Sequence, residues 1–172
     1  MSERLPVHLD PIAQANRGRS VHGTVPVRAF RRLAEWLHSD AGELDVRLAF
    51  GRDESGRRQV TGRIQGALSL VCHRCMVPYE LPIDLDLSLV LVESEAEAET
   101  LPDELDALVI DDARSMHTVD MIEDDLILAL PLVPRCEHYR ECTPAVELLD
   151  SESLEEGDGP RQQAFGDIGH DA

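Results

Sequence analysis

The chain of 172 residues contains no lysine, only four cysteines, and no uninterrupted apolar run of the length that a membrane helix needs. A bilayer-spanning helix takes about 18 or more consecutive apolar residues. A secretory signal peptide would begin with a basic region followed by an apolar stretch, and the chain shows no such start. We therefore expect a cytoplasmic protein with no membrane contact. The missing lysine excludes no class of protein, because coding bias alone produces such a composition.

Several motifs that mark enzymes are also missing. The sequence has no glycine-rich phosphate loop, no Gly-x-Ser-x-Gly turn and no His-Glu-x-x-His helix. A chain of this length buries roughly 70% of its unfolded surface in one core. We therefore expect one folded domain over residues 1–150, and we expect it not to be an enzyme.

Charge divides the chain into two unlike halves. Residues 1–80 carry 12 arginines against nine acidic residues, whereas residues 81–172 carry four arginines against 25 acidic residues. Acidic surfaces repel nucleic-acid phosphates and attract basic partners. Any direct contact with RNA is therefore expected in the N-terminal half, and a basic protein partner in the C-terminal half.

Apolar alternation predicts an antiparallel sheet. Residues 44–50 alternate, a turn follows at residues 53–56, and residues 60–71 resume an extended pattern, which together predict a hairpin. Residues 79–92 alternate most strongly, with leucine or isoleucine at every odd position from 81 to 91. The natural partner of this strand is residues 60–71, with residues 72–78 as the connection.

Weaker patterns complete the predicted fold. Residues 5–9 and 19–27 alternate weakly, and the second of these stretches is a candidate edge strand; residues 29–38 show an amphipathic helical pattern. Residues 93–104 predict an acidic mobile loop, 108–110 a short strand, and 151–172 a disordered acidic tail. The fold class is thus α+β, with an antiparallel meander that is open or barrel-like and a few helices.

The cysteines fall into two close pairs, Cys72 with Cys75 and Cys136 with Cys142. In a reducing compartment, paired thiols serve as metal ligands, redox groups or plain buried thiols more often than as disulfides. A Cys-x2-Cys turn between strands directs both sulfurs to one side, so that a second pair completes a tetrahedral zinc shell. His138 is an alternate ligand. Structural zinc and four unmetallated thiols both remain open, whereas the strand predicted after Cys75 argues against a thioredoxin-like redox centre.

An acidic run, Glu123-Asp124-Asp125, begins a predicted helix in which Asp120 is the N-cap and Glu123 completes a capping box, with the apolar residues running on to Pro131. Carboxylates in a first helical turn interact favourably with the helix dipole. Neighbouring positions do not converge on one point, so this run is expected to stabilise the helix and not to catalyse. The alternative is an acidic recognition edge beside the cysteines.

The block 121–134, with Cys72-x2-Cys75 upstream and Cys142 downstream, resembles the YceD family of bacterial proteins. The opening residues 5–11 and the stretch 23–27 resemble the start of that family, so the resemblance covers residues 5–142. Position 136 is often histidine in such proteins and is cysteine here, and the frequent Asn-Pro-Phe ending is replaced by Gln163-Ala164-Phe165.

The resemblance implies a non-enzymatic role in the synthesis, processing or stability of 23S ribosomal RNA, with no established catalytic residue. A ribosomal protein or the large-subunit ribosomal RNA is the implied partner. Two alternatives remain: an enzyme that acts on RNA or thiols, and an acidic interaction module whose effect on ribosomes is indirect.

Overall fold

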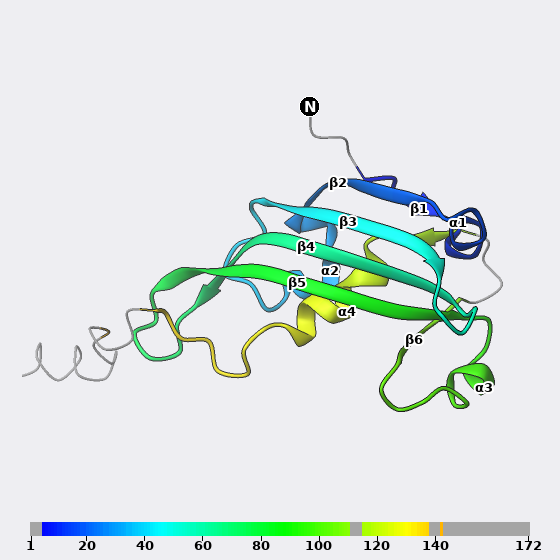
Figure 1. Ribbon diagram of the computed structural model, residues 1–172. Helices are drawn as coiled ribbons and strands as arrows, with labels where there is room; N and C mark the ends of the chain where they lie inside the picture. Colours follow the sequence, from blue (N-terminus) through cyan, green and yellow to red (C-terminus); the bar gives the residue numbers. More distant parts are fainter. Residues whose placement is uncertain (1–4, 111–114, 138–141, 143–172) are drawn as a thin grey trace, which may run out of the picture.

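One five-stranded sheet organises the chain, and its order is β2-β3-β4-β5-β6 (Figure 1). The computed structural model describes residues 5–110, 115–137 and 142. All neighbouring strands are antiparallel except β5 and β6, which run parallel. The strands are β2 (Ser20–Pro26), β3 (Glu43–Arg52), β4 (Arg58–Val71), β5 (Pro78–Val92) and β6 (Asp106–Val109).

The predicted α+β class and the predicted strand pairs are confirmed. β3 and β4 form the expected hairpin, and β4 pairs with β5 in one unbroken register from Gln59↔Val90 to Val71↔Pro78. The stretch 19–27 forms the edge strand β2, and residues 108–110 lie at the end of β6. The sheet stays open, because the end strands β2 and β6 do not pair with each other in the described part of the chain. The barrel-like alternative was therefore wrong.

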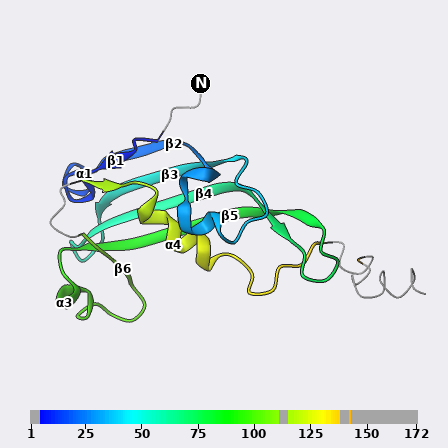
Figure 2. The ribbon, with the colours of Figure 1, turned by 180° about the vertical axis from the view of Figure 1, so that it is seen from behind.

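One face of the sheet carries the core. Alternate residues of β3, β4 and β5 point to this face, including Val46, Ile64 and Leu87. Two helices, α2 (Arg31–Ala34) and α4 (Asp120–Leu128), lie over it (Figure 2). They contribute Phe30 at the start of α2 and Ile122 in α4, both fully buried. The opposite face of the sheet is polar, as the alternation predicted.

The N-terminal residues form a strand of a second, two-stranded sheet and then the helix α1. β1 (His8–Leu9) pairs with β7 (Met116–His117). Asp10 caps α1 (Pro11–Arg17) by accepting from the Ala13 N–H at 2.8 Å, and Gly18 ends the helix in the left-handed conformation. The sequence analysis missed α1, although Asp10, Pro11 and Gly18 are the residue types that begin and end helices. No helix in the described ranges is long and apolar enough to cross a membrane.

The predicted helix over residues 29–38 was too long. A 3-10 turn, η1 (Val27–Ala29), is followed by α2 as a single turn. The chain then leaves the helix because the His38 N–H donates to the Ser69 carbonyl at 2.8 Å and Ser39 forms a bridge with Ser69. β4 extends beyond its pairing with β3, so its backbone groups at Ser69 are open to this contact. A tertiary hydrogen bond therefore overrides the helical pattern.

The predicted capping box of α4 was also wrong. Val119 is the N-cap residue and makes no side-chain capping bond, and the helix ends at Leu128 instead of at Pro131. Glu123 does not turn back on its own helix. Its Oε1 accepts from the backbone N–H groups of Arg32 and Leu33 at 2.8 and 3.2 Å, and its Oε2 accepts from the Arg32 Nε at 2.9 Å. Glu123 therefore caps α2, a helix whose residues lie 90 and 91 positions earlier in the sequence.

The three carboxylates of the acidic run have three different roles. Glu123 is 4% exposed and is satisfied by donors from α2. Asp124 is exposed and forms an ion pair with the Arg32 Nη1 at 2.6 Å. Asp125 is half-buried, and burial, with nearby Asp106 and Asp124, raises its pKa. Glu123 and Asp124 therefore join α4 to α2.

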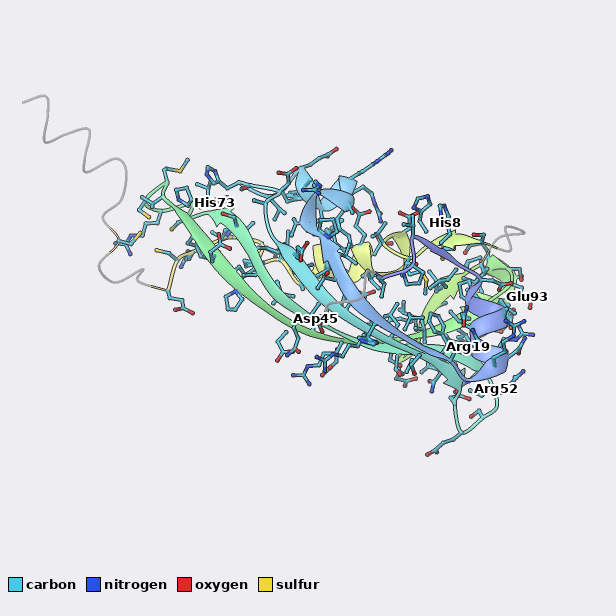
Figure 3. The ribbon with its side chains drawn as sticks, turned by 90° about the horizontal axis from the view of Figure 1, so that it is seen from above. His8, Arg19, Asp45, Arg52, His73 and Glu93 are labelled. Atoms are coloured by element: carbon cyan, nitrogen blue, oxygen red, sulfur yellow. The ribbon has the colours of Figure 1, made fainter. Side chains whose placement is uncertain are left out.

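The acidic segment 93–104 contains a one-turn helix, α3 (Glu95–Ala98), capped by the Ser94 side chain. It lies at the opposite end of the sheet from the first cysteine pair. Figure 3 shows this separation, with Glu93 near one end and His73 near the other. The predicted acidic tail, residues 151–172, lies outside the described residues.

We predict that Glu123→Ala lowers the free energy of unfolding by about 2–3 kcal/mol, because it leaves buried backbone donors of α2 without an acceptor. Glu123→Gln keeps one acceptor oxygen and should cost less. Asp124→Ala is the matched control, since it removes only an exposed ion pair, and its effect should be a small fraction of that of Glu123→Ala. Urea denaturation measures all three. Equal losses for Glu123→Ala and Asp124→Ala would contradict the capping role.

Candidate metal centre

The four cysteines lie together at one end of the molecule. Their sulfur atoms are all within 4.8 Å of one another, and the Sγ atoms of Cys72 and Cys142 are 3.9 Å apart. The cluster joins residues that are up to 70 positions apart in sequence. Cys72 and Cys142 are buried, whereas Cys75 and Cys136 are partly exposed. The predicted meeting of the two pairs is therefore present in the structure.

The first pair sits in the turn between β4 and β5. This hairpin extends beyond β3, so its tip projects from the body of the sheet (Figure 1). The Cys72 N–H donates to the Val77 carbonyl at 3.0 Å, and the Met76 N–H donates to the Cys72 carbonyl at 2.9 Å. Met76 has φ of +59° and is the one residue other than glycine with positive φ in the described ranges. The turn places Cys72 and Cys75 on the same side.

The second pair arrives from the segment that follows α4. Prolines at 131 and 134 keep this segment from continuing the helix. The His73 N–H donates to the Pro134 carbonyl at 2.9 Å, which anchors the segment to the cysteine turn two residues before Cys136. The backbone itself therefore holds the two pairs against each other. The alternate ligand His138 lies outside the described residues.

Backbone hydrogen bonds and burial shift the pKa values of the cysteine thiols in opposite directions. Hydrogen bonds from the backbone of Cys75, and then of Cys136, lower the pKa of Cys72 to about 6. Burial raises the pKa of Cys142 to about 12, and burial also raises the pKa of Cys136. Tyr79 packs nearby, where burial and the negative charge of Cys72 raise its pKa. Cys72 is thus favoured as a thiolate, and cation binding would displace protons from Cys136 and Cys142.

The donor set fits a tetrahedral metal ion. Zinc binds thiolates at about 2.3 Å, which places the sulfurs of a tetrahedral site about 3.8 Å apart. The Cys72–Cys142 distance of 3.9 Å already matches this value, and no pair of sulfurs exceeds 4.8 Å. A shift of about 1 Å or less would therefore complete the shell. Soft thiolate ligands select zinc over calcium or magnesium.

A second candidate site is a groove of about 680 Å³ between residues 5–7 and 24–32 of the N-terminal half and residues 117–123. Arg28, Arg31 and Arg32 line it, together with His117 and Glu123. Arg32 is committed to Glu123 and Asp124, whereas Arg28 and Arg31 are exposed and have no ion-pair partner among the described residues. Guanidinium groups bind phosphates through paired hydrogen bonds. Arg28 and Arg31 therefore suit an anion in a groove that both halves of the chain line and that Asp120 also lines.

Sequence reasoning found the four cysteines but missed the features that arrange them. The positive φ of Met76 had one sequence signal, because Met76 directly follows the Cys-x2-Cys turn. The Pro134 contact carried no local signal. Arg31 and Arg32 were interpreted only as part of the polar face of the helix predicted over residues 29–38, and Arg28 was not considered.

Replacing Met76 by glycine should stabilise the cysteine turn. A residue with a side chain in the left-handed region costs about 1–2 kcal/mol relative to glycine, and the Met76 side chain is largely exposed, so little packing is lost. We expect Met76→Gly to raise the free energy of unfolding by about 1 kcal/mol. The neighbouring Val77→Gly is the control and should lower it. A loss in both variants, measured in urea, would show that Met76 is not strained.

Comparison with known proteins adds an independent line of evidence. Residues 60–166 match the family model described as "Large ribosomal RNA subunit accumulation protein YceD". A protein of that name from Haemophilus influenzae is 30% identical over 131 residues, which cover 76% of this chain and 75% of the relative. No solved structure matches the chain. The family model covers β5, α4, β4 from Val60 onward and all four cysteines, and the chain belongs to the YceD family.

Proposed function

We propose that this protein is a non-enzymatic cytoplasmic factor that supports the synthesis, processing or stability of 23S ribosomal RNA. The observation that carries the proposal is the relationship to the YceD protein of Haemophilus influenzae over three quarters of both chains. Its name refers to accumulation of the large ribosomal RNA. Glu123 and Asp124, two of the three carboxylates considered for acid–base chemistry, are occupied by contacts with α2, which supports a non-enzymatic role.

The proposal includes a structural zinc ion held by Cys72, Cys75, Cys136 and Cys142. The support is the close approach of four sulfurs from two chain segments and the anchoring of one segment to the other through Pro134. The ion would fasten the segment after α4 to the tip of the β4–β5 hairpin. Zinc in such a closed shell has no open position for a substrate, so its contribution is stability.

In this proposal two surfaces each bind a different partner. The groove with Arg28 and Arg31 would receive phosphates of ribosomal RNA. The acidic second half would receive a basic partner such as a ribosomal protein. There are two alternative functions. One is an enzyme that acts on RNA or thiols, and the second is an acidic interaction module whose effect on ribosomes is indirect.

Deletion of the gene should lower mature 23S relative to 16S ribosomal RNA, because the proposed role is specific to the large subunit. Quantitative electrophoresis of total RNA measures the ratio, and restoration by a plasmid copy is the control. A plasmid copy with Arg28→Glu and Arg31→Glu tests the groove in the same strain. An equal loss of both RNAs in the deletion strain would contradict the proposal.

Removal of zinc should destabilise the protein without unfolding it completely, because the core under α2 and α4 is separate from the cysteine end. We expect a chelator to lower Tm by about 10 °C, as for a loss of a few kcal/mol in a chain of this size. Cys142→Ser should lower Tm similarly, and the chelator should then have little further effect. Additive losses from the variant and the chelator would show that the metal binds elsewhere.

A further inference from the structure

The outer edge of β5 has no neighbouring strand over most of its length. β4 pairs with residues 78–90 on one side, but on the other side β6 pairs only with Leu89–Val92. Within the described ranges, residues 79–88 therefore have a single strand neighbour. Figures 1 and 2 show β5 as the outermost strand toward the hairpin tip, with β6 beside its far end only.

The register identifies which backbone groups face outward. The Val77 carbonyl accepts from the Cys72 N–H, so the backbone groups of residue 77 face β4. In an antiparallel pair the backbone groups of successive residues face alternate sides. Because the register is unbroken, the odd residues of β5 bond to β4. Even residues then point their N–H and C=O groups to the free edge. Two facts agree: the Val92 carbonyl accepts from Ile110 on that side, and Pro82, which has no N–H, stands at an even position. Glu80, Asp84 and Asp86 therefore present free backbone donors.

The side chains on this edge have a definite chemistry. Glu80, Pro82, Asp84 and Asp86 are exposed on the polar face of the sheet. Asp84 forms an ion pair with the Arg63 guanidinium, which also lies 3.7 Å from Asp86, so two carboxylates share one arginine. On the other face Leu81 and Leu85 are only half-buried. The edge is thus acidic on one face and apolar on the other.

This charge pattern disfavours pairing with a second copy of the chain. Two β5 edges side by side would bring carboxylates against carboxylates, and opposed like charges destabilise a strand pair. Charge on an edge strand is also a common defence against self-association. A strand of opposite charge meets no such barrier.

We propose that the free edge of β5 binds an extended basic peptide as an added strand. The peptide alternates arginine or lysine with apolar residues: the basic side chains lie beside Glu80, Asp84 and Asp86, and the apolar ones beside Leu81 and Leu85. Backbone hydrogen bonds to the edge supply affinity and the alternation supplies specificity. The inference rests on the proposed function, because it names the site at which the basic partner docks.

Hydrogen exchange on the purified protein tests the proposal directly. The probe is a synthetic peptide of about ten residues that alternates arginine and valine, with a peptide of the same charge that carries a central proline as control. The amides of Glu80, Asp84 and Asp86 should exchange fast in the free protein and slowly with the alternating peptide. The proline peptide should protect them much less. Equal protection by both peptides, or none by either, overturns the proposal.

Variants separate the backbone from the charge. Asp86→Pro removes an outward N–H, whereas Asp86→Asn removes the charge and keeps that donor. We expect Asp86→Pro to weaken peptide binding by more than about tenfold and Asp86→Asn by less, in fluorescence anisotropy. Neutralising Glu95 and Glu97 of α3 and the adjacent Glu99, at the far end of the sheet, is the control and should change binding little. Full binding by a folded Asp86→Pro variant overturns the proposal, as does dimerisation of the free protein through β5 in ultracentrifugation.

These results are independent of ribosomal RNA levels. Failure of the peptide to bind would leave the deletion phenotype intact. An unchanged ratio of 23S to 16S ribosomal RNA in the deletion strain would overturn the proposed function without altering the peptide measurements.

Discussion

The carboxylate of Glu123 is the contact on which the arrangement of the helical layer depends. It is buried, yet it is surrounded by donors from α2: two backbone N–H groups and the guanidinium of Arg32. A buried carboxylate without such partners is strongly unfavourable, so this contact specifies how α2 and α4 lie on the sheet. Because α4 leads directly into Pro131 and Pro134, the position of α4 also directs the chain toward the cysteine turn.

The cysteine end follows from the unequal lengths of the strands. β4 and β5 extend past β3, so the hairpin beyond Gln65 has no pairing with β3. Two contacts support it: Ser39 pairs with Ser69 on one edge, and Pro134 accepts from His73 at the tip. Neither contact buries a large apolar surface. A metal ion in the four-sulfur cluster would add a further connection between this tip and the segment after α4.

The sequence predicted what is local and repetitive. The strict alternation of residues 79–92 identified β5, and its partner followed from the short connection at 72–78. The cysteine spacing suggested a cluster that the structure contains. These features could be predicted because the period of the side chains and the length of a turn depend only on residues that are close together in the sequence.

The errors arose where a distant residue decides the outcome. Glu123 fits a capping box by sequence, but α2 offers it three donors and its own helix fewer. The helical pattern at 29–38 is interrupted because Ser69 binds His38. The parallel pairing of β6 depends on how the chain returns after α3, which no local pattern encodes.

The central claim is that four cysteine sulfurs alone bind one zinc ion. X-ray absorption of the zinc-loaded protein tests it: the account predicts four sulfur neighbours at about 2.3 Å, and a shell that includes nitrogen, as from His138, would contradict it.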